Sequence, residues 1–184
     1  MALKLYLDSG TTQEITDVNP DELKQAVSSG ADINNEIQLY IKSDDNSLTY
    51  ENITIEETSI ADDWVTATSY VARDGGTDTP ADYVIGSDSN IYKCIQDHTS
   101  GSDDDEPITG ANYGNYWKQV KDVDIQYAED NTGSPDTYSD PLVLPNAKYD
   151  TAVPIWRKSD ILSINEAFIR EDIRHKIIAD EYID

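Results

Sequence analysis

Short runs of this chain alternate apolar with polar residues, and a period of two is the pattern of strands that bury one face. Residues 3–7 alternate in this way, and a Ser-Gly turn separates them from residues 13–16, which predicts a short strand in a hairpin. Residues 37–41 and 50–55 alternate as well, on either side of an Asp-Asp-Asn turn. We expect these two runs to pair as a second β-hairpin.

The second half of the chain carries further strand signals. Residues 123–127, 142–144 and 153–157 contain alternating or apolar runs. Apolar residues around position 165 have helical spacing, whereas residues 173–179 alternate. The tail is therefore ambiguous between helix and strand, and a terminal strand is the favoured interpretation.

One segment predicts a helix. Asn19 can cap it, Pro20 suits its first turn, and the acids Asp21 and Glu22 favour its positive end. Gly30 then ends it. We expect a short helix here in an otherwise β-rich chain.

The charge is strongly one-sided. The 184 residues include 13 Lys and Arg against 37 Asp and Glu, a formal net charge of −24. Nucleic-acid phosphates must be met by clustered cations, and anionic membrane surfaces repel a chain of this sign. The composition therefore argues against nucleic acid and membrane as partners.

Basic residues concentrate late in the chain. The group comprises Arg157, Lys158, Arg170, Arg174 and Lys176. On so acidic a chain these side chains can contact an acidic neighbour in an assembly, and ordinary local ion pairing is the alternative. They are the candidate assembly contacts.

Residues suited to catalysis or metal binding are scarce. The lone cysteine, Cys94, excludes an internal disulfide and a cysteine-based zinc site, and there are two histidines, His98 and His175. The acidic residues 103–106 lack the EF-hand spacing and are typical of a solvated loop. No apolar run approaches the roughly 18 residues of a membrane span, and no export signal is visible. We expect no enzyme activity, no cofactor and no metal.

Residues 61–120 differ from the flanking sequence, because most large aromatics gather there between glycine turns. Their pattern runs from Trp64 through Tyr83 and a glycine turn to a short strand around Tyr92, then through a proline-containing loop to Trp117. This pattern resembles the small chitin-binding-type carbohydrate modules that are appended to chitinases and also occur in phage virion proteins. The resemblance implies a small twisted β-sheet whose exposed aromatic rings stack on sugars.

The aromatic residues of this region are the candidate carbohydrate-binding residues: Trp64, Tyr70, Tyr83, Tyr92, Tyr113, Tyr116 and Trp117. A module of about 60 residues with few aliphatic side chains must also build its core from such rings. Trp64, Tyr92 and Trp117 are accordingly better explained as core. An insertion at residues 73–80 lengthens the first loop beyond the pattern of the family.

The flanks carry a pattern of their own in residues 38–45, in residues 48–55, and in residues 141–144 leading to Val-Pro-Ile-Trp-Arg at 153–157. These segments resemble immunoglobulin-like β-sandwich domains common in virion proteins of tailed bacteriophages. In those domains a hairpin is followed, often after an insertion, by a strand pair that ends in an apolar-Trp-Arg segment. The resemblance implies a structural part of a virion.

The expected fold is mostly β: an immunoglobulin-like β-sandwich with a short helix and an inserted small β module. Residues 1–60 plus 121–184 form the sandwich, because each half alone has too few strands for two sheets. Residues 61–120 form the inserted carbohydrate-binding-module-like domain. An insertion costs little where its two ends lie close together.

The leading functional hypothesis is a non-enzymatic structural protein of a tailed virus particle, as a capsid decoration or turret, a neck protein or a tail component. We expect it in the virion after assembly in the host cytoplasm, in contact with other virion proteins and with copies of itself in a symmetric homo-oligomer. Host-surface polysaccharide is a further candidate partner of the inserted module. The alternative is a free carbohydrate-binding module, an adhesin or an enzyme accessory fragment. A third hypothesis, a small hydrolase, is supported only by the abundance of carboxylates.

Overall fold

The structure is a computed structural model that describes residues 3–16, 21, 23–25, 31–72, 81–101, 105–120, 123–164, 168–170 and 172–183. These residues are mainly in β-strands, which confirms the expectation of a mostly β chain. The helix among them, α1 (Tyr113–Tyr116), is about one turn long. No helix in these ranges is long and apolar enough to cross a membrane.

The first sheet has four strands, all antiparallel. Their order is β1 (Leu3–Tyr6), β3 (Ala31–Ser43), β13 (Val153–Ile164) and β11 (Val123–Glu129). The turn after β1 returns to it, since the Ile15 amide donates to the Leu5 carbonyl, as the first predicted hairpin requires.

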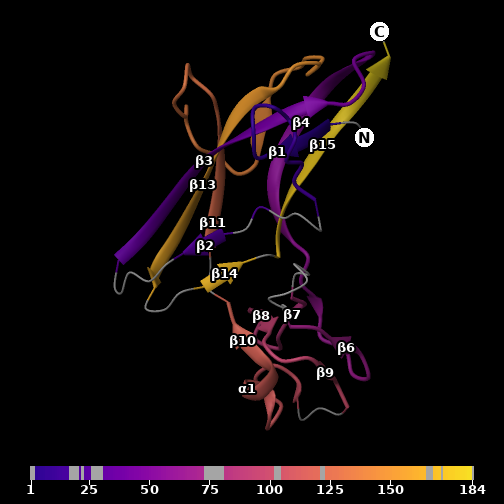
Figure 1. The fold of residues 1–184 in the computed structure, drawn as a ribbon, viewed down its shortest axis with the longest axis vertical. Helices are drawn as coiled ribbons and strands as arrows, with labels where there is room; N and C mark the ends of the chain where they lie inside the picture. Colours follow the sequence, from indigo (N-terminus) through magenta and orange to yellow (C-terminus); the bar gives the residue numbers. More distant parts are fainter. Residues whose placement is uncertain are drawn as a thin grey trace.

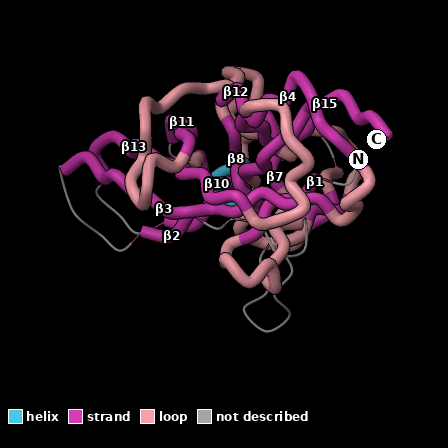
Figure 2. The backbone as a smooth tube through the Cα atoms, turned by 90° about the horizontal axis from the view of Figure 1, so that it is seen from above, coloured by secondary structure: helices cyan, strands magenta, loops and turns pink. Residues whose placement is uncertain are grey.

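The second sheet has three antiparallel strands in the order β12 (Leu142–Leu144), β4 (Leu48–Ser59) and β15 (Ile173–Ile183). β15 confirms the predicted terminal strand. It pairs with β4 along its whole length and lies beside that strand in both views (Figures 1 and 2).

The two sheets share one hydrophobic core. Alternate residues of β3 and β4, such as Leu39, Ile41, Ile53 and Ile55, are completely buried in the same cluster. Ile125 of β11 joins them from the edge of the first sheet. The period of two in the sequence therefore marks the inner faces of two sheets that face each other.

The predicted hairpin of residues 37–41 with 50–55 is wrong. β3 and β4 are consecutive strands, but they belong to different sheets. The Ser43 hydroxyl accepts the Asp45 amide at 3.0 Å and shares a hydrogen bond with the Tyr50 hydroxyl at 2.7 Å. This connection carries the chain across the core instead of back alongside β3.

The predicted helix is also wrong where the structure describes it. Leu23–Gln25 is a strand, β2, which pairs antiparallel with β14 (Phe168–Arg170). The other residues of that prediction, apart from Asp21, lie outside the described ranges. A tertiary pairing with a distant strand thus overrides the local capping signals.

A smaller unit lies beyond the ends of β4 and β11, at the lower end of Figure 1. Its four-stranded sheet has the order β10 (Trp117–Gln119), β8 (Ile91–Cys94), β7 (Tyr83–Ile85) and β5 (Asp62–Asp63). The strands β6 (Ser69–Tyr70) and β9 (His98–Thr99) form a separate antiparallel pair. Both chain termini lie at the opposite end of the long axis (Figure 1).

The smaller unit has its own core. Tyr70, Val84, Tyr92, Cys94 and Trp117 form this second buried cluster. Three of the five are aromatic, so the unit fills its interior with rings, as a small domain with few aliphatic residues must.

Candidate functional site

Four of the seven predicted carbohydrate-binding residues are buried. Tyr70, Tyr83, Tyr92 and Trp117 are each between 2% and 7% exposed. Their ring faces are covered by protein, so they are unavailable for stacking on a sugar. The interpretation of Tyr92 and Trp117 as core residues is confirmed.

The other three aromatics lie closer to the surface. Trp64 and Tyr116 are partly buried and pack against the second core. Tyr113, at the start of α1, is exposed. Tyr113 and Tyr116 lie three positions apart in the same helical turn, so their side chains occupy neighbouring positions.

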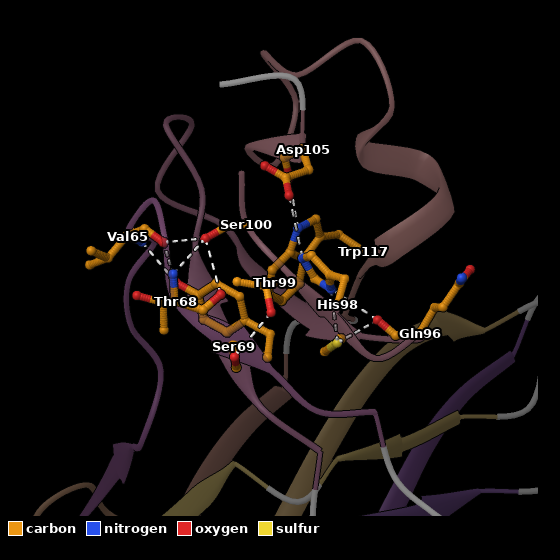
Figure 3. A network of polar contacts seen from close by, with 11 residues as sticks. Val65, Thr68, Ser69, Gln96, His98, Thr99, Ser100, Asp105 and Trp117 are labelled. Carbon is orange, nitrogen blue, oxygen red and sulfur yellow. Dashed lines mark hydrogen bonds and ion pairs between the residues drawn. The ribbon is translucent and has the colours of Figure 1, made fainter. Parts of the chain in front are cut away.

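The His98 ring packs against two of these aromatic residues, Tyr116 and Trp117. Its ring stacks on Tyr116 with centroids 4.3 Å apart and meets Trp117 edge-on at 5.2 Å. Its Nδ1 lies 2.9 Å from the carbonyl oxygen of Gln96, an acceptor, so Nδ1 carries the hydrogen. Figure 3 shows His98 directed to Gln96 on one side and to Asp105 on the other.

The His98 and Asp105 side chains each contain a buried polar atom, Nε2 of His98 and Oδ1 of Asp105. His98 Nε2 lies 3.8 Å from Asp105 Oδ2, beyond hydrogen-bond distance, and neither Nε2 nor Asp105 Oδ1 has a hydrogen-bond partner among the described residues. The backbone of Asp105 is fixed, because the Trp117 indole donates to its carbonyl oxygen at 2.8 Å. His98 Nε2 and Asp105 Oδ1 are closed to solvent, so they do not form a site that a ligand in solution can reach.

A second group of polar contacts fixes the loop before β6 (Figure 3). The Ser100 hydroxyl accepts the Thr68 amide at 3.0 Å and donates to the Val65 carbonyl at 2.8 Å. The Tyr70 hydroxyl accepts the Val65 amide at 2.8 Å, and burial raises the pKa of this phenol. The aromatic cluster therefore sits on a backbone that is held at several points.

The predicted assembly contacts are dispersed. Lys158 pairs with Asp160, Lys176 pairs with Glu56, and Arg174 donates to the carbonyl oxygen of its neighbour in the chain. The side chain of Arg170 lies outside the described residues. Local pairing, the alternative interpretation, thus accounts for much of this group.

Arg157 requires a correction. Its side chain is 1% exposed, and its Nε and Nη2 donate to the two carboxylate oxygens of Asp21 at 2.9 and 2.8 Å. A guanidinium enclosed in this way cannot meet a neighbouring protein. The expectation that Arg157 is an assembly contact is therefore wrong.

The Asp21–Arg157 pair belongs to a buried polar network that sequence reasoning missed. His175 Nε2 lies 3.1 Å from Asp21 Oδ2, and His175 Nδ1 lies 2.6 Å from the Tyr127 hydroxyl. Arg157 also donates to the Ser159 hydroxyl at 3.2 Å. These residues come from distant parts of the chain, and no short sequence motif indicates that they meet.

The buried network shifts the pKa values of Asp21 and Tyr127. Burial opposes ionisation of Asp21, but the hydrogen bond from His175 and the charge of Arg157 outweigh it and lower the pKa of that carboxyl. Burial also raises the pKa of the Tyr127 phenol far above its usual range. A hollow of about 180 Å³ between β1 and β15 is lined partly by His175, yet the His175 side chain is only 1% exposed. The network can join the two sheets, and it presents no reactive group to solvent.

Metal ligands are not assembled in the described part of the chain. No group of three or more His, Cys, Asp or Glu side chains there is arranged to hold a metal ion. Two of the four residues of the acidic run 103–106, Asp103 and Asp104, lie outside the described residues.

A scan against family models found no match to this chain, and searches of curated proteins and of solved structures found none either.

Proposed function

We propose that this chain is a non-enzymatic structural protein of a tailed virus particle, with an immunoglobulin-like β-sandwich body that displays an inserted small β module. The observation that carries the proposal is the axial layout of the molecule. The chain leaves the body after β4 and returns at β11, and the termini lie at the end opposite the small unit (Figure 1). A body anchored by its terminal end would hold the module outward.

The sandwich assignment is supported by the seven strands that the structure describes in two sheets around one core. The pairing departs from that of a constant-type immunoglobulin domain, in which the second body strand pairs with the fifth and the third with the sixth. Here β3 pairs with β13, the sixth body strand, and β4 pairs with β15, the seventh. We therefore propose a variant of the class.

The division into residues 1–60 plus 121–184 and residues 61–120 is also part of the proposal. Two separate hydrophobic clusters support it: among the described residues the first has no member between Ile55 and Val123, and the second lies within 64–117. Each cluster is the core that an independent domain requires.

Scaffolding is supported by the closed character of the polar groups. The Asp21, Arg157 and His175 side chains are all buried against one another. The proposed partners are copies of the chain and other virion proteins, and the proposed place of assembly is the host cytoplasm. Lys176, the most exposed of the late basic side chains with a described ion pair, remains a candidate contact.

For the displayed module we propose contact with host-surface polysaccharide through Tyr113 and Tyr116. Tyr116 is braced by its stack on His98, which holds its ring in one orientation before a ligand arrives. A pyranose offers a C–H face that matches such a ring. The buried aromatics would act as the support of this surface.

The assembly proposal is tested by light scattering of the purified full chain at low and high salt. A discrete symmetric oligomer at both salt concentrations is the expected result. A monomer under both conditions would contradict the virion role and favour a free carbohydrate-binding module.

The polysaccharide proposal is tested by pull-down of the full chain on insoluble chitin and other polysaccharides. Tyr113→Ala is expected to reduce retention several-fold, because stacking area is lost. Val143→Ala is the control, since Val143 is also an exposed large hydrophobic residue but lies on β12 of the body. Equal retention of both variants, or no retention of the unmodified chain, would remove the module from the proposal.

A further inference from the structure

β15 is an edge strand with an open side. It pairs with β4 from Ile173 to Ile183, with one register shift between Ile178 and Asp180 where β4 carries an extra residue, and no strand among the described residues pairs with its other side. The backbone of these eleven residues can hydrogen-bond to a further strand. Proteins usually shorten, bend or cover an exposed edge strand of this length. The edge of β15 is therefore a candidate site for pairing with a strand of another chain.

The order of side chains along β15 is self-complementary. The strand reads Ile-Arg-His-Lys-Ile-Ile-Ala-Asp-Glu-Tyr-Ile, with basic residues first, an apolar centre and acidic residues last. A copy of this strand running in the opposite direction places acidic residues beside basic ones. A parallel copy in register would place like charges together.

Sheet geometry then selects the register. Residues directly opposite each other in an antiparallel pair must lie on the same face, so the two positions must sum to an even number. On the outer face, Lys176 and Asp180 point away from the core, as does Ile178 at the centre, which is 45% exposed. A two-fold axis through Ile178 places Lys176 of each copy opposite Asp180 of the other and brings the two Ile178 side chains together.

We propose that two copies of this chain pair through β15 in the antiparallel register centred on Ile178, which joins their three-stranded sheets into one. In the single chain, Lys176 pairs with Glu56, and Asp180 accepts a hydrogen bond from Asn52. Each group keeps room for a second partner, because an ammonium carries three donors and a carboxylate accepts several bonds. The contact uses only β15, so it stands independently of the proposed function.

The register is tested by cross-linking. Ile178→Cys is expected to form a disulfide-linked dimer under mild oxidation, because the two positions are directly opposite across the axis. Val143→Cys is the matched control: Val143 lies in the same outer row, is 63% exposed, and sits on β12 at the far edge of the sheet. The native Cys94 is buried and is common to both variants. Equal cross-linking of both variants would overturn the register.

The charge pairing is tested by a swap, measured as the dimer dissociation constant by sedimentation. Lys176→Asp and Asp180→Lys are each expected to weaken the dimer roughly tenfold, because two symmetric attractions become repulsions. The double variant K176D/D180K is expected to restore affinity. Glu56→Gln, which removes only the intrachain partner of Lys176, is expected to keep the dimer.

Other outcomes separate this proposal from the virion role. An oligomer whose mass is unchanged by Lys176→Asp and by Ile178→Lys would overturn the β15 contact and leave the virion proposal standing. A monomer at all concentrations, with no cross-link at position 178, would overturn both the β15 contact and the virion proposal.

Discussion

Asp21 and Arg157 are 136 residues apart in the chain and form a two-pronged ion pair inside the protein, with N···O distances of 2.9 and 2.8 Å. Asp21 lies in an N-terminal segment, whereas Arg157 belongs to β13 of the first sheet. His175 of the second sheet contacts the same carboxylate. One acid thus connects three parts of the body.

Replacing Asp21 should strongly destabilise the body. Asp21→Asn removes the negative charge and leaves the Arg157 guanidinium buried without its counter-ion, which costs about 3 kcal/mol of unfolding free energy or more. Urea denaturation of the full chain measures this loss. Asp150→Asn, at an exposed position, is the control and should stay within about 0.5 kcal/mol. A similar midpoint for both variants would contradict the structural role of the pair.

The Asp21 carboxylate should make the free energy of unfolding depend on pH. Its pKa is lower in the folded protein than in the unfolded chain, where an aspartate titrates near 3.9. The stabilisation from ionised Asp21 is therefore fully present above about pH 4 and is lost as the pH falls through the lower folded value. Urea midpoints between pH 7 and pH 3 should fall less steeply for Asp21→Asn than for the unmodified chain. Parallel curves would show that Asp21 is not responsible.

Tyr127 and Asp21 should be energetically coupled through His175. Tyr127→Phe removes the hydroxyl that lies 2.6 Å from His175 Nδ1 and leaves a buried ring nitrogen unpaired, at a cost of about 1–3 kcal/mol. A double-mutant cycle with Asp21→Asn is expected to give an interaction energy above about 0.5 kcal/mol, because both changes act on one imidazole. Additive effects would mean that the two contacts are independent.

Gly86 should tolerate no side chain. A Cβ built there would lie 2.7 Å from Cε2 of the buried Tyr92 ring, so Gly86→Ala must displace the second core, at about 1–3 kcal/mol. Gly101→Ala is the matched control, because a Cβ there meets no heavy atom of the described residues within 4 Å. Thermal unfolding followed by tryptophan fluorescence compares the two. If Gly101→Ala lowers the melting temperature as much as Gly86→Ala, the clash does not explain the effect.

The Cys94 thiol should be unreactive in the folded protein. It is completely buried, and burial raises its pKa to about 11. Labelling with a thiol-reactive chromogenic disulfide at pH 8 is expected to be slow in buffer and fast in concentrated urea. Rapid labelling without urea would show that the second core opens readily.

Several features could be predicted from the sequence alone because they depend on local pattern. The alternation in residues 3–7 and 173–179 specifies strands with one buried face, and β1 and β15 are observed there. The ring-rich composition of residues 61–120 required an aromatic core, and Tyr92 and Trp117 supply it. The predictions of an immunoglobulin-like class, of a virion role and of sugar binding stay predictions.

Other features were decided only by the tertiary structure. Alternation shows which face of a strand is buried, but it does not name the neighbouring strand, so β3 and β4 were expected to pair and instead entered different sheets. Likewise, nothing near Asp21 or Arg157 in the sequence indicates the other, because their ion pair forms only when the two sheets close around one core. Local patterns are fixed by side-chain spacing along the backbone, whereas strand partners and buried charge pairs depend on which distant segments can be enclosed together.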